Sequence, residues 1–144
     1  MRHCQLRVQC FLDGYTLEMA QRRIIAMRII ELTVMLASSK PERLAAFYEN
    51  VLQLERVPNY HDPVFQLGGS LLRIIHHSAV HGTNQMPARC QLNLFVADAI
   101  AECARLTGQV TFVRPPEREP WGGIVATLAD PDGNYIQLIQ TPPK

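Results

Sequence analysis

The chain has 144 residues, of which 47% are hydrophobic, and its 14 basic and 13 acidic side chains nearly cancel. This length suits one domain, or two very small ones that share a core. The balanced charge and the 7% of aromatic residues argue against a nucleic-acid surface, and the apolar runs are too short to span a bilayer, so we expect a soluble, cytoplasmic protein.

Residues 1–26 differ from the rest of the chain. A helix is predicted from Thr16 to Met27, with Glu18 and Arg22 at i,i+4 spacing, but a regular strand pattern begins only at Met27. No apolar core of a secretory signal is present in this stretch. We therefore expect an amino-terminal extension over residues 1–26 and a compact domain over residues 27–144; a partner-binding arm is the functional alternative for the extension.

The first half of the domain reads as a strand, a helix and a hairpin. Residues 29–37 are rich in β-branched and long apolar side chains and predict a strand. Ser39 three positions before Glu42 forms a capping box for a helix, with Pro41 in its first turn. Residues 64–67 and 71–75 flank two glycines, which predicts a β-hairpin.

The second half repeats this pattern. A strand over residues 90–96 precedes a helix that begins at Asp98 and ends before Gly108. A short strand over residues 110–113 follows, and residues 123–128 and 135–140 form a last hairpin. The segment Asp130-Pro131-Asp132-Gly133-Asn134 between them has strong turn chemistry, which explains its two aspartates without any acid–base role.

The two halves align as a degenerate repeat. Residues 33–36 fall on residues 91–94 at an offset of 58, and residues 69–75 fall on residues 133–139 at an offset of 64. The difference of six residues falls in the connections, where insertions are tolerated. We therefore expect two modules, over residues 27–86 and 87–144, that fold by packing together.

Three segments resemble the vicinal oxygen chelate superfamily, which comprises glyoxalases, bleomycin resistance proteins and extradiol dioxygenases. They are Ala45-Ala46-Phe47-Tyr48-Glu49-Asn50-Val51-Leu52, Leu94-Phe95-Val96-Ala97-Asp98 and, most specifically, Leu128-Ala129-Asp130-Pro131-Asp132-Gly133-Asn134-Tyr135-Ile136-Gln137-Leu138. The resemblance implies an α+β fold in which paired βαβββ modules form a curved mixed sheet around a cleft, usually completed in a homodimer.

The resemblance also locates the metal ligands of the metal-dependent members. Those positions map onto Thr33, Arg73, Gln91 and Gln137, and none of them supplies an imidazole or a carboxylate. A divalent ion prefers neutral imidazole or anionic oxygen, whereas arginine keeps its positive charge in proteins. We therefore expect no metal and no other cofactor at this place.

A displaced metal site is the alternative. Glu31 lies two positions before Thr33, and His77 lies two beyond Ile75, so both would share the predicted ligand face. No residue of the second module joins them. A solvated strand end is the simpler explanation for His76 and His77.

Strand alternation defines a mixed polar and apolar surface on the same face. We expect its ligand-binding residues to be Thr33, Met35, Arg73, Gln91, Asn93, Phe95, Tyr135 and Gln137. Trp121, in the loop before residue 123, either stacks on a planar ligand or packs on the sheet edge. Cys90 and Cys103 are expected to be small buried side chains, and no Cys-x-x-Cys pair suggests zinc or disulfide chemistry.

Arg73 is the charged residue of this surface. It either holds an anionic ligand, extends its head into water, or pairs with Glu31 or a partner chain. Two functions stay open. One is the non-catalytic sequestration of a planar or anionic small molecule in a homodimer cleft without metal. The other is a lyase, isomerase or dioxygenase of the same superfamily, with catalytic residues that the sequence does not identify.

Overall fold

A computed structural model describes residues 27–143. The predicted helix beginning at Thr16 and the expected extension over residues 1–26 lie outside this range. The compact unit begins at Thr33, and residues 27–32 form neither helix nor strand. No helix within the described range is long and apolar enough to cross a membrane.

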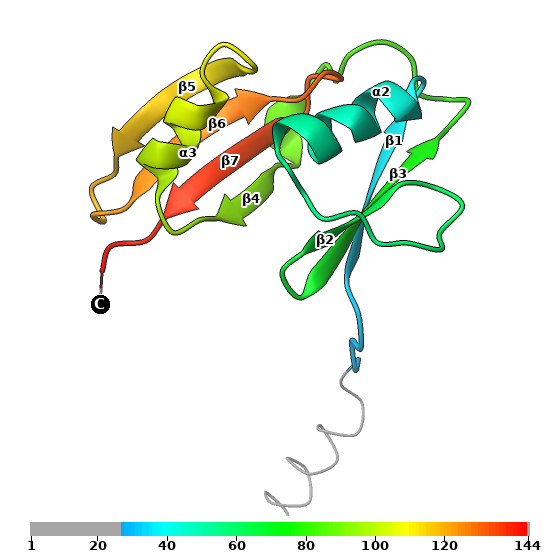
Figure 1. Cartoon of the computed structure of the whole chain (residues 1–144), viewed down its shortest axis with the longest axis horizontal. Helices are drawn as coiled ribbons and strands as arrows, with labels where there is room; N and C mark the ends of the chain where they lie inside the picture. Colours follow the sequence, from blue (N-terminus) through cyan, green and yellow to red (C-terminus); the bar gives the residue numbers. More distant parts are fainter. Residues whose placement is uncertain (1–26, 144) are drawn as a thin grey trace, which may run out of the picture. The chain divides into compact units, whose positions relative to one another are not determined.

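The elements of module one are β1 (Thr33–Ser38), α2 (Pro41–Ala46), η1 (Phe47–Val51), β2 (Val64–Leu67) and β3 (Ser70–His76). Its sheet has the order β1-β3-β2, with β1 parallel and β2 antiparallel to β3 (Figure 1). The prediction that the first strand begins at residue 29 is wrong. Thr33 pairs with Leu71, so residues before Leu32 would face the Gly68-Gly69 turn, where β3 offers no ladder partner.

A short fourth segment, residues 55–57, also pairs with this sheet. Arg56 forms an isolated bridge with Phe65, Val57 N donates to Val64 O at 2.8 Å, and Gln66 N donates to Glu55 O at 2.9 Å. Residues 55–57 therefore lie beside β2 at the edge of the sheet. Pro58 lacks a backbone donor and follows at once, which explains why the strand is too short to be recognised in the sequence.

The elements of module two are η2 (Pro87–Arg89), β4 (Leu92–Phe95), α3 (Ala99–Leu106), β5 (Thr111–Arg118), β6 (Ile124–Ala129) and β7 (Tyr135–Gln140). The sheet order is β4-β7-β6-β5, with β4 parallel to β7. This order matches module one once residues 55–57 are counted beside β2. Each module is thus a βαβββ unit, and the α+β fold expected from the sequence is confirmed.

Strand register confirms the repeat residue by residue. Val34 pairs with Leu72 in module one, and Leu92 pairs with Ile136 in module two. Adding 58 to 34 gives 92, and adding 64 to 72 gives 136, so the two offsets taken from the sequence superpose the two parallel ladders.

The helix of module two begins as the sequence predicts, whereas the helix of module one begins differently. Asp98 caps α3 by accepting a hydrogen bond from Ala101 N at 2.9 Å, as predicted. The predicted capping box of Ser39 is wrong. Pro41 is the first helical residue, so Lys40 stands at the N-cap, and Ser38 Oγ accepts from Lys40 N at 2.9 Å.

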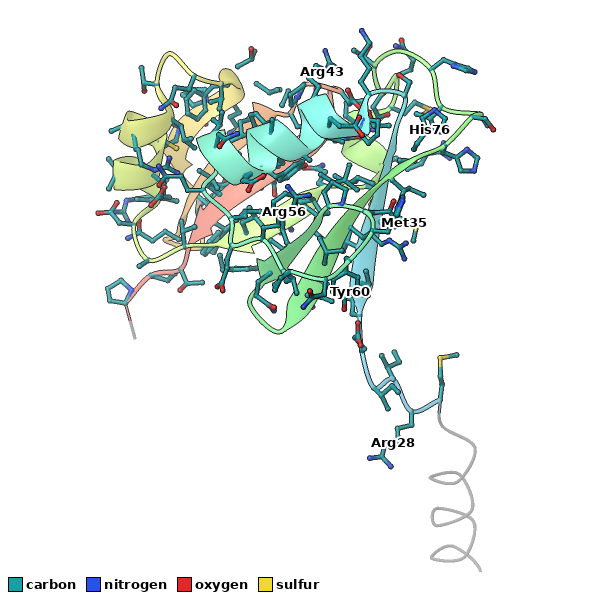
Figure 2. All side chains as sticks on the ribbon, turned by 45° about the vertical axis from the view of Figure 1, so that its right-hand side comes forward. Arg28, Met35, Arg43, Arg56, Tyr60 and His76 are labelled. Atoms are coloured by element: carbon teal, nitrogen blue, oxygen red, sulfur yellow. The ribbon has the colours of Figure 1, made fainter. Side chains whose placement is uncertain are left out.

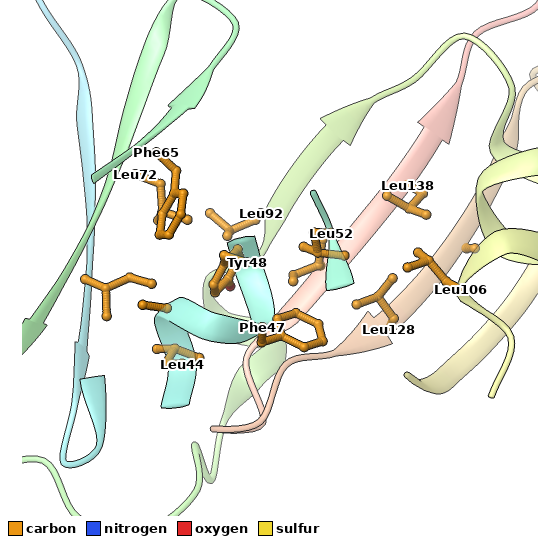
Figure 3. Close-up of a cluster of buried hydrophobic side chains, with 14 of the residues drawn as sticks. Leu44, Phe47, Tyr48, Leu52, Phe65, Leu72, Leu92, Leu106, Leu128 and Leu138 are labelled. Carbon is orange, nitrogen blue, oxygen red and sulfur yellow. The ribbon is translucent and has the colours of Figure 1, made fainter. Parts of the chain in front are cut away.

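One hydrophobic core joins the two modules, and the module-one helix contributes to it with both of its segments (Figure 3). The helix supplies Leu44, Phe47, Tyr48 and Leu52; the first sheet supplies Phe65, Leu72 and Ile74; module two supplies Leu92, Cys103, Leu106, Leu128, Ile136 and Leu138. Burial of each large apolar side chain contributes roughly 1.5–3 kcal/mol. The modules therefore stabilise one another through side chains of both sheets.

Candidate functional site

Thr33, Met35 and Arg73 share one face of the first sheet. Met35 pairs directly with Arg73 across the β1–β3 ladder, and Thr33 lies two residues earlier on the same strand. Met35 is 54% exposed and projects from β1 (Figure 2). The alternate residues, such as Leu72 and Ile74, are fully buried in the shared core. We call the face that carries Arg73 the first candidate face.

Module two carries the corresponding second candidate face. Asn93 pairs with Gln137, and Phe95 pairs with Ile139, so these residues share one side of the sheet. Phe95 is 69% exposed. Gln137 Nε2 donates to Thr127 Oγ1 at 3.4 Å on the neighbouring strand. Tyr135, two residues before Gln137, belongs to the same face.

These two faces do not meet within one chain. The strands of the two modules belong to separate sheets with no shared ladder. Both sheets turn their other faces to the one core cluster, as the membership of Leu72 and Leu138 shows. The candidate faces therefore point away from that core, and the predicted residues fall into two groups, one on each sheet.

Asp62 is the partner of Arg73. Arg73 Nε donates to Asp62 Oδ2 at 3.0 Å, and Arg73 Nη2 donates to the same oxygen. His61 Nδ1 lies 3.3 Å from Asp62 Oδ1. These hydrogen bonds, from Arg73 first and His61 second, lower the pKa of Asp62. Sequence analysis proposed Glu31 or a partner chain for Arg73 and missed Asp62.

The sequence did contain a signal for this pair. A two-residue turn at Gly68-Gly69 sets Leu67 opposite Ser70, which places Val64 opposite Arg73. Asp62 lies two residues before Val64 and so belongs on the same face. The predicted hairpin register was sufficient to place a carboxylate beside Arg73.

Gln91 lies at the start of the second candidate face. Its Nε2 donates to Ala88 O at 3.3 Å, while its Oε1 is buried and has no partner within residues 27–143. An unsatisfied buried amide oxygen is unfavourable, which makes Gln91 a position where a donor from outside the described chain would be stabilising.

Trp121 packs on the backbone just before β6, which is an inner strand of its sheet. A Cβ placed on Gly123 would lie 1.8 Å from the Trp121 ring, so the indole rests directly on the glycine backbone at the start of β6. The ring is still 51% exposed. The indole therefore has a contact within the chain, and its ligand-stacking role stays a prediction.

The resemblance assigns metal ligands to four positions of this chain, and the side chains at those positions do not suit a divalent ion. Arg73 is a permanent cation already paired with a carboxylate, and Thr33, Gln91 and Gln137 are uncharged. Residues 27–143 contain no group of three His, Cys, Asp or Glu side chains that would hold a metal. His77 Nδ1 accepts from Ala79 N at 3.2 Å, as expected of a solvated turn.

The two cysteines in the described range differ from one another. Cys103 is buried, and burial raises the pKa of its thiol, which makes it unreactive. Cys90 is exposed, so the expectation that it is buried is wrong. It precedes β4 rather than lying inside the strand, which begins at Leu92. Cys90 and Cys103 are both free cysteines and are not joined by a disulfide.

The turn at Asp130 joins the two modules. Asp130 Oδ1 accepts from the backbone N–H groups of Asp132 and Asn134 at 2.9 Å, which is the predicted turn geometry. Its Oδ2 accepts from Tyr48 Oη at 2.9 Å, a link to module one that sequence analysis missed. Burial first and the carboxylate of Asp130 second raise the pKa of Tyr48 well above its usual value. Arg43 contacts the same turn through Asp132 Oδ1 at 2.5 Å.

Two pockets lie along the segment that connects the modules. The first has a volume of about 320 Å³ and is lined by Ala37, Ala79, Val80, His81, Gly82, Thr83, Asn84, Asp132 and Asn134. The second, of about 370 Å³, is lined by Asn84, Gln85, Met86, Arg89 and Cys90. None of the nine predicted binding residues lines either of these two pockets.

Comparison with known proteins identifies the family. The Glyoxalase/Bleomycin resistance protein/Dioxygenase superfamily matches residues 32–138. No curated protein matches the chain.

Solved structures with the same fold cover most of both chains. A member of this superfamily from Sphaerobacter thermophilus has a TM-score of 0.64 at 24% identity and covers 80% of this chain and 99% of its own. TioX from Micromonospora sp. ML1 has a TM-score of 0.63 at 17% identity, covering 78% and 98%. A lactoylglutathione lyase from Agrobacterium tumefaciens has a TM-score of 0.60 at 18% identity, covering 81% and 95%. With the repeated βαβββ units and the matched residues 32–138, the chain belongs to the glyoxalase/bleomycin resistance protein/dioxygenase superfamily.

Proposed function

We propose that the chain is a cytoplasmic homodimer that binds a planar small molecule without metal and without chemical conversion. The ligand lies between the first candidate face of one copy and the second candidate face of its partner. Membrane and nucleic acid are not its targets, since its charge is balanced.

The observation that carries this proposal is the chemistry at Arg73. At a position where the related metal enzymes have a ligand, this chain has a guanidinium already neutralised by Asp62. The three equivalent positions hold a hydroxyl and two amides. Such a set orients a ligand by hydrogen bonds and offers no charge to hold a divalent ion.

Exposed apolar side chains support a binding role for both faces. Met35 is 54% exposed and Phe95 is 69% exposed, next to the polar groups of Arg73 and Asn93. Each face therefore exposes one large apolar side chain beside polar groups. A few polar groups among apolar walls is the usual composition of a small-molecule site.

Fluorescent probes and metal analysis test the proposal. N-phenyl-1-naphthylamine, a planar neutral dye, is expected to bind the purified full chain. Phe95→Ser should weaken this binding by about fivefold or more, because a large buried contact is removed. Ile100→Ser is the matched control, since Ile100 is 49% exposed but lies on α3. Elemental analysis should find substoichiometric metal.

Two results would contradict the proposal. One is dye binding that responds equally to Phe95→Ser and Ile100→Ser. The other is near-stoichiometric nickel, zinc, iron or manganese that is lost when Gln91 or Arg73 is replaced. The second result would favour a lyase, isomerase or dioxygenase that uses a metal.

A further inference from the structure

We propose that Asp62 is a specificity-determining residue, a built-in competitor that occupies Arg73 in place of the anionic group of a ligand. An acidic ligand must displace this carboxylate, so the native surface favours neutral ligands over their acidic analogues. The inference rests on the proposed binding function and specifies which ligands that site accepts.

The geometry of the pair supports competition at Arg73. Nε and Nη2 form the edge of a guanidinium with which arginine commonly binds carboxylates, and both donate to Asp62 Oδ2. A ligand carboxylate or sulfonate that approached the same edge would meet the negative charge of Asp62. The two anions therefore exclude one another at this edge.

The position of Asp62 makes displacement possible. Asp62 belongs to the connection between residues 55–57 and β2, outside any helix or strand. The pair remains accessible, because the Arg73 side chain is 41% exposed and that of Asp62 is 25% exposed. Ion pairs with this much solvent contact are weak and exchangeable.

Asp62 also sets the charge of the first candidate face. The residues that alternate with the core on β1 and β3 are Thr33, Met35, Ala37, Leu71, Arg73 and Ile75, and only Arg73 is charged. With Asp62 ionised, the pair adds no net charge. Removal of the carboxylate leaves one uncompensated guanidinium on the face where the ligand binds. The first candidate face then prefers anionic ligands.

A pair of dyes separates charge from shape. N-phenyl-1-naphthylamine is neutral, and 8-anilinonaphthalene-1-sulfonate has the same aromatic body with one negative charge. In the full chain, Asp62→Asn should tighten sulfonate binding by about tenfold, because one charge-assisted hydrogen bond becomes available. Binding of the neutral dye should change by less than about twofold, since the apolar contacts remain.

Two further variants assign the effect to Arg73. The double variant Asp62→Asn with Arg73→Gln should lose the gain in sulfonate binding. Glu49→Gln is the matched control, because it removes one acidic charge and one exposed ion pair, Glu49–Arg56 at 3.2 Å, within the same module. That variant should bind both dyes like the native chain.

Three outcomes would overturn the inference while the neutral dye still binds. They are unchanged sulfonate binding in Asp62→Asn, a gain that persists without Arg73, and an equal gain in Glu49→Gln. Absence of neutral-dye binding in every variant would instead overturn the proposed function, and the inference with it. Circular dichroism and thermal melting of each variant establish that all of them are folded.

Discussion

The Asp130 side chain stabilises its own turn and also connects the two modules. A carboxylate accepts several hydrogen bonds at once, and this one accepts from two backbone N–H groups, from Asn134 Nδ2 and from Tyr48 Oη. Asp130 and Tyr48 are both buried. Buried polar groups need hydrogen-bond partners, so Tyr48 contributes to stability through Asp130 as well as through its ring.

We predict that Tyr48→Phe lowers the free energy of unfolding by about 1.5–3 kcal/mol, the usual size of a hydrogen bond to a charged group. The aromatic ring, 6.3 Å from that of Phe65, is retained in this variant. Urea denaturation measures the change. Tyr60→Phe is the control, because Tyr60 is 51% exposed and its variant should stay within about 0.5 kcal/mol. Equal stability of the two variants would contradict the role of the Tyr48–Asp130 bond.

The same bond predicts a dependence on alkaline pH. The pKa of Tyr48 is raised in the folded chain, so folding favours the protonated phenol. This contribution is fully present below about pH 10, the pKa of unfolded tyrosine, and is lost as the pH rises toward the folded value. The stability difference between the native chain and Tyr48→Phe should therefore shrink above about pH 10.

Helix starts illustrate what local sequence decides at the scale of an element. Asp98 is the N-cap of α3, and nothing in the residues that follow prevents them from forming a helix, so α3 begins where predicted. In α2, Pro41 fixes the first helical position by its ring, and this moves the cap to Lys40 instead of Ser39. The capping box was predicted from residue spacing alone, and it placed the N-cap of α2 one residue too early.

The corresponding prediction compares two alanine variants. Asp98→Ala should lower the free energy of unfolding by about 1 kcal/mol, since the Ala101 N–H loses its acceptor. Ser39→Ala should change it by less than about 0.5 kcal/mol, because Ser39 makes no cap in α2. Thermal or urea unfolding distinguishes them, and a larger loss in Ser39→Ala would show that Ser39 does cap the helix.

Most elements were predictable because their signals are local. Alternation and turn residues located both hairpins, and the two repeat offsets agree with the Val34–Leu72 and Leu92–Ile136 pairs of the parallel ladders. Signals that depend on a distant partner were not found. The strand at residues 55–57 exists because β2 lies beside it, and the pair Tyr48–Asp130 joins residues that are 82 positions apart. The Arg73–Asp62 pair, 11 positions apart, followed from the hairpin register and was overlooked.

At the scale of the whole molecule, the separation of the two candidate faces determines how a binding site is assembled. The faces belong to different sheets that share one core on their opposite sides. In the proposed function, a ligand enclosed by both faces lies between two copies, with module one of each facing module two of the other.

A mixing experiment tests this arrangement. Met35→Glu and Phe95→Glu each place a charge on one candidate face, and each variant alone should lose neutral-dye binding. In a mixed dimer, one cleft receives both substitutions and the other receives neither. Binding should therefore return to about half of the native capacity per mixed dimer after the two variants are unfolded and refolded together. No recovery would contradict a cleft shared between copies.

The bond between Tyr48 and Asp130 also has a consequence for synthesis. It spans 82 positions, and the helix that bears Tyr48 packs on Leu128 and Leu138 in the same core. Domains fold during translation only when their contacting parts have been made. The part of the helix near residue 48 that packs with module two therefore stays uncovered until β6 and β7 have emerged from the ribosome. This interval is when a nascent chain of this kind has most need of a chaperone.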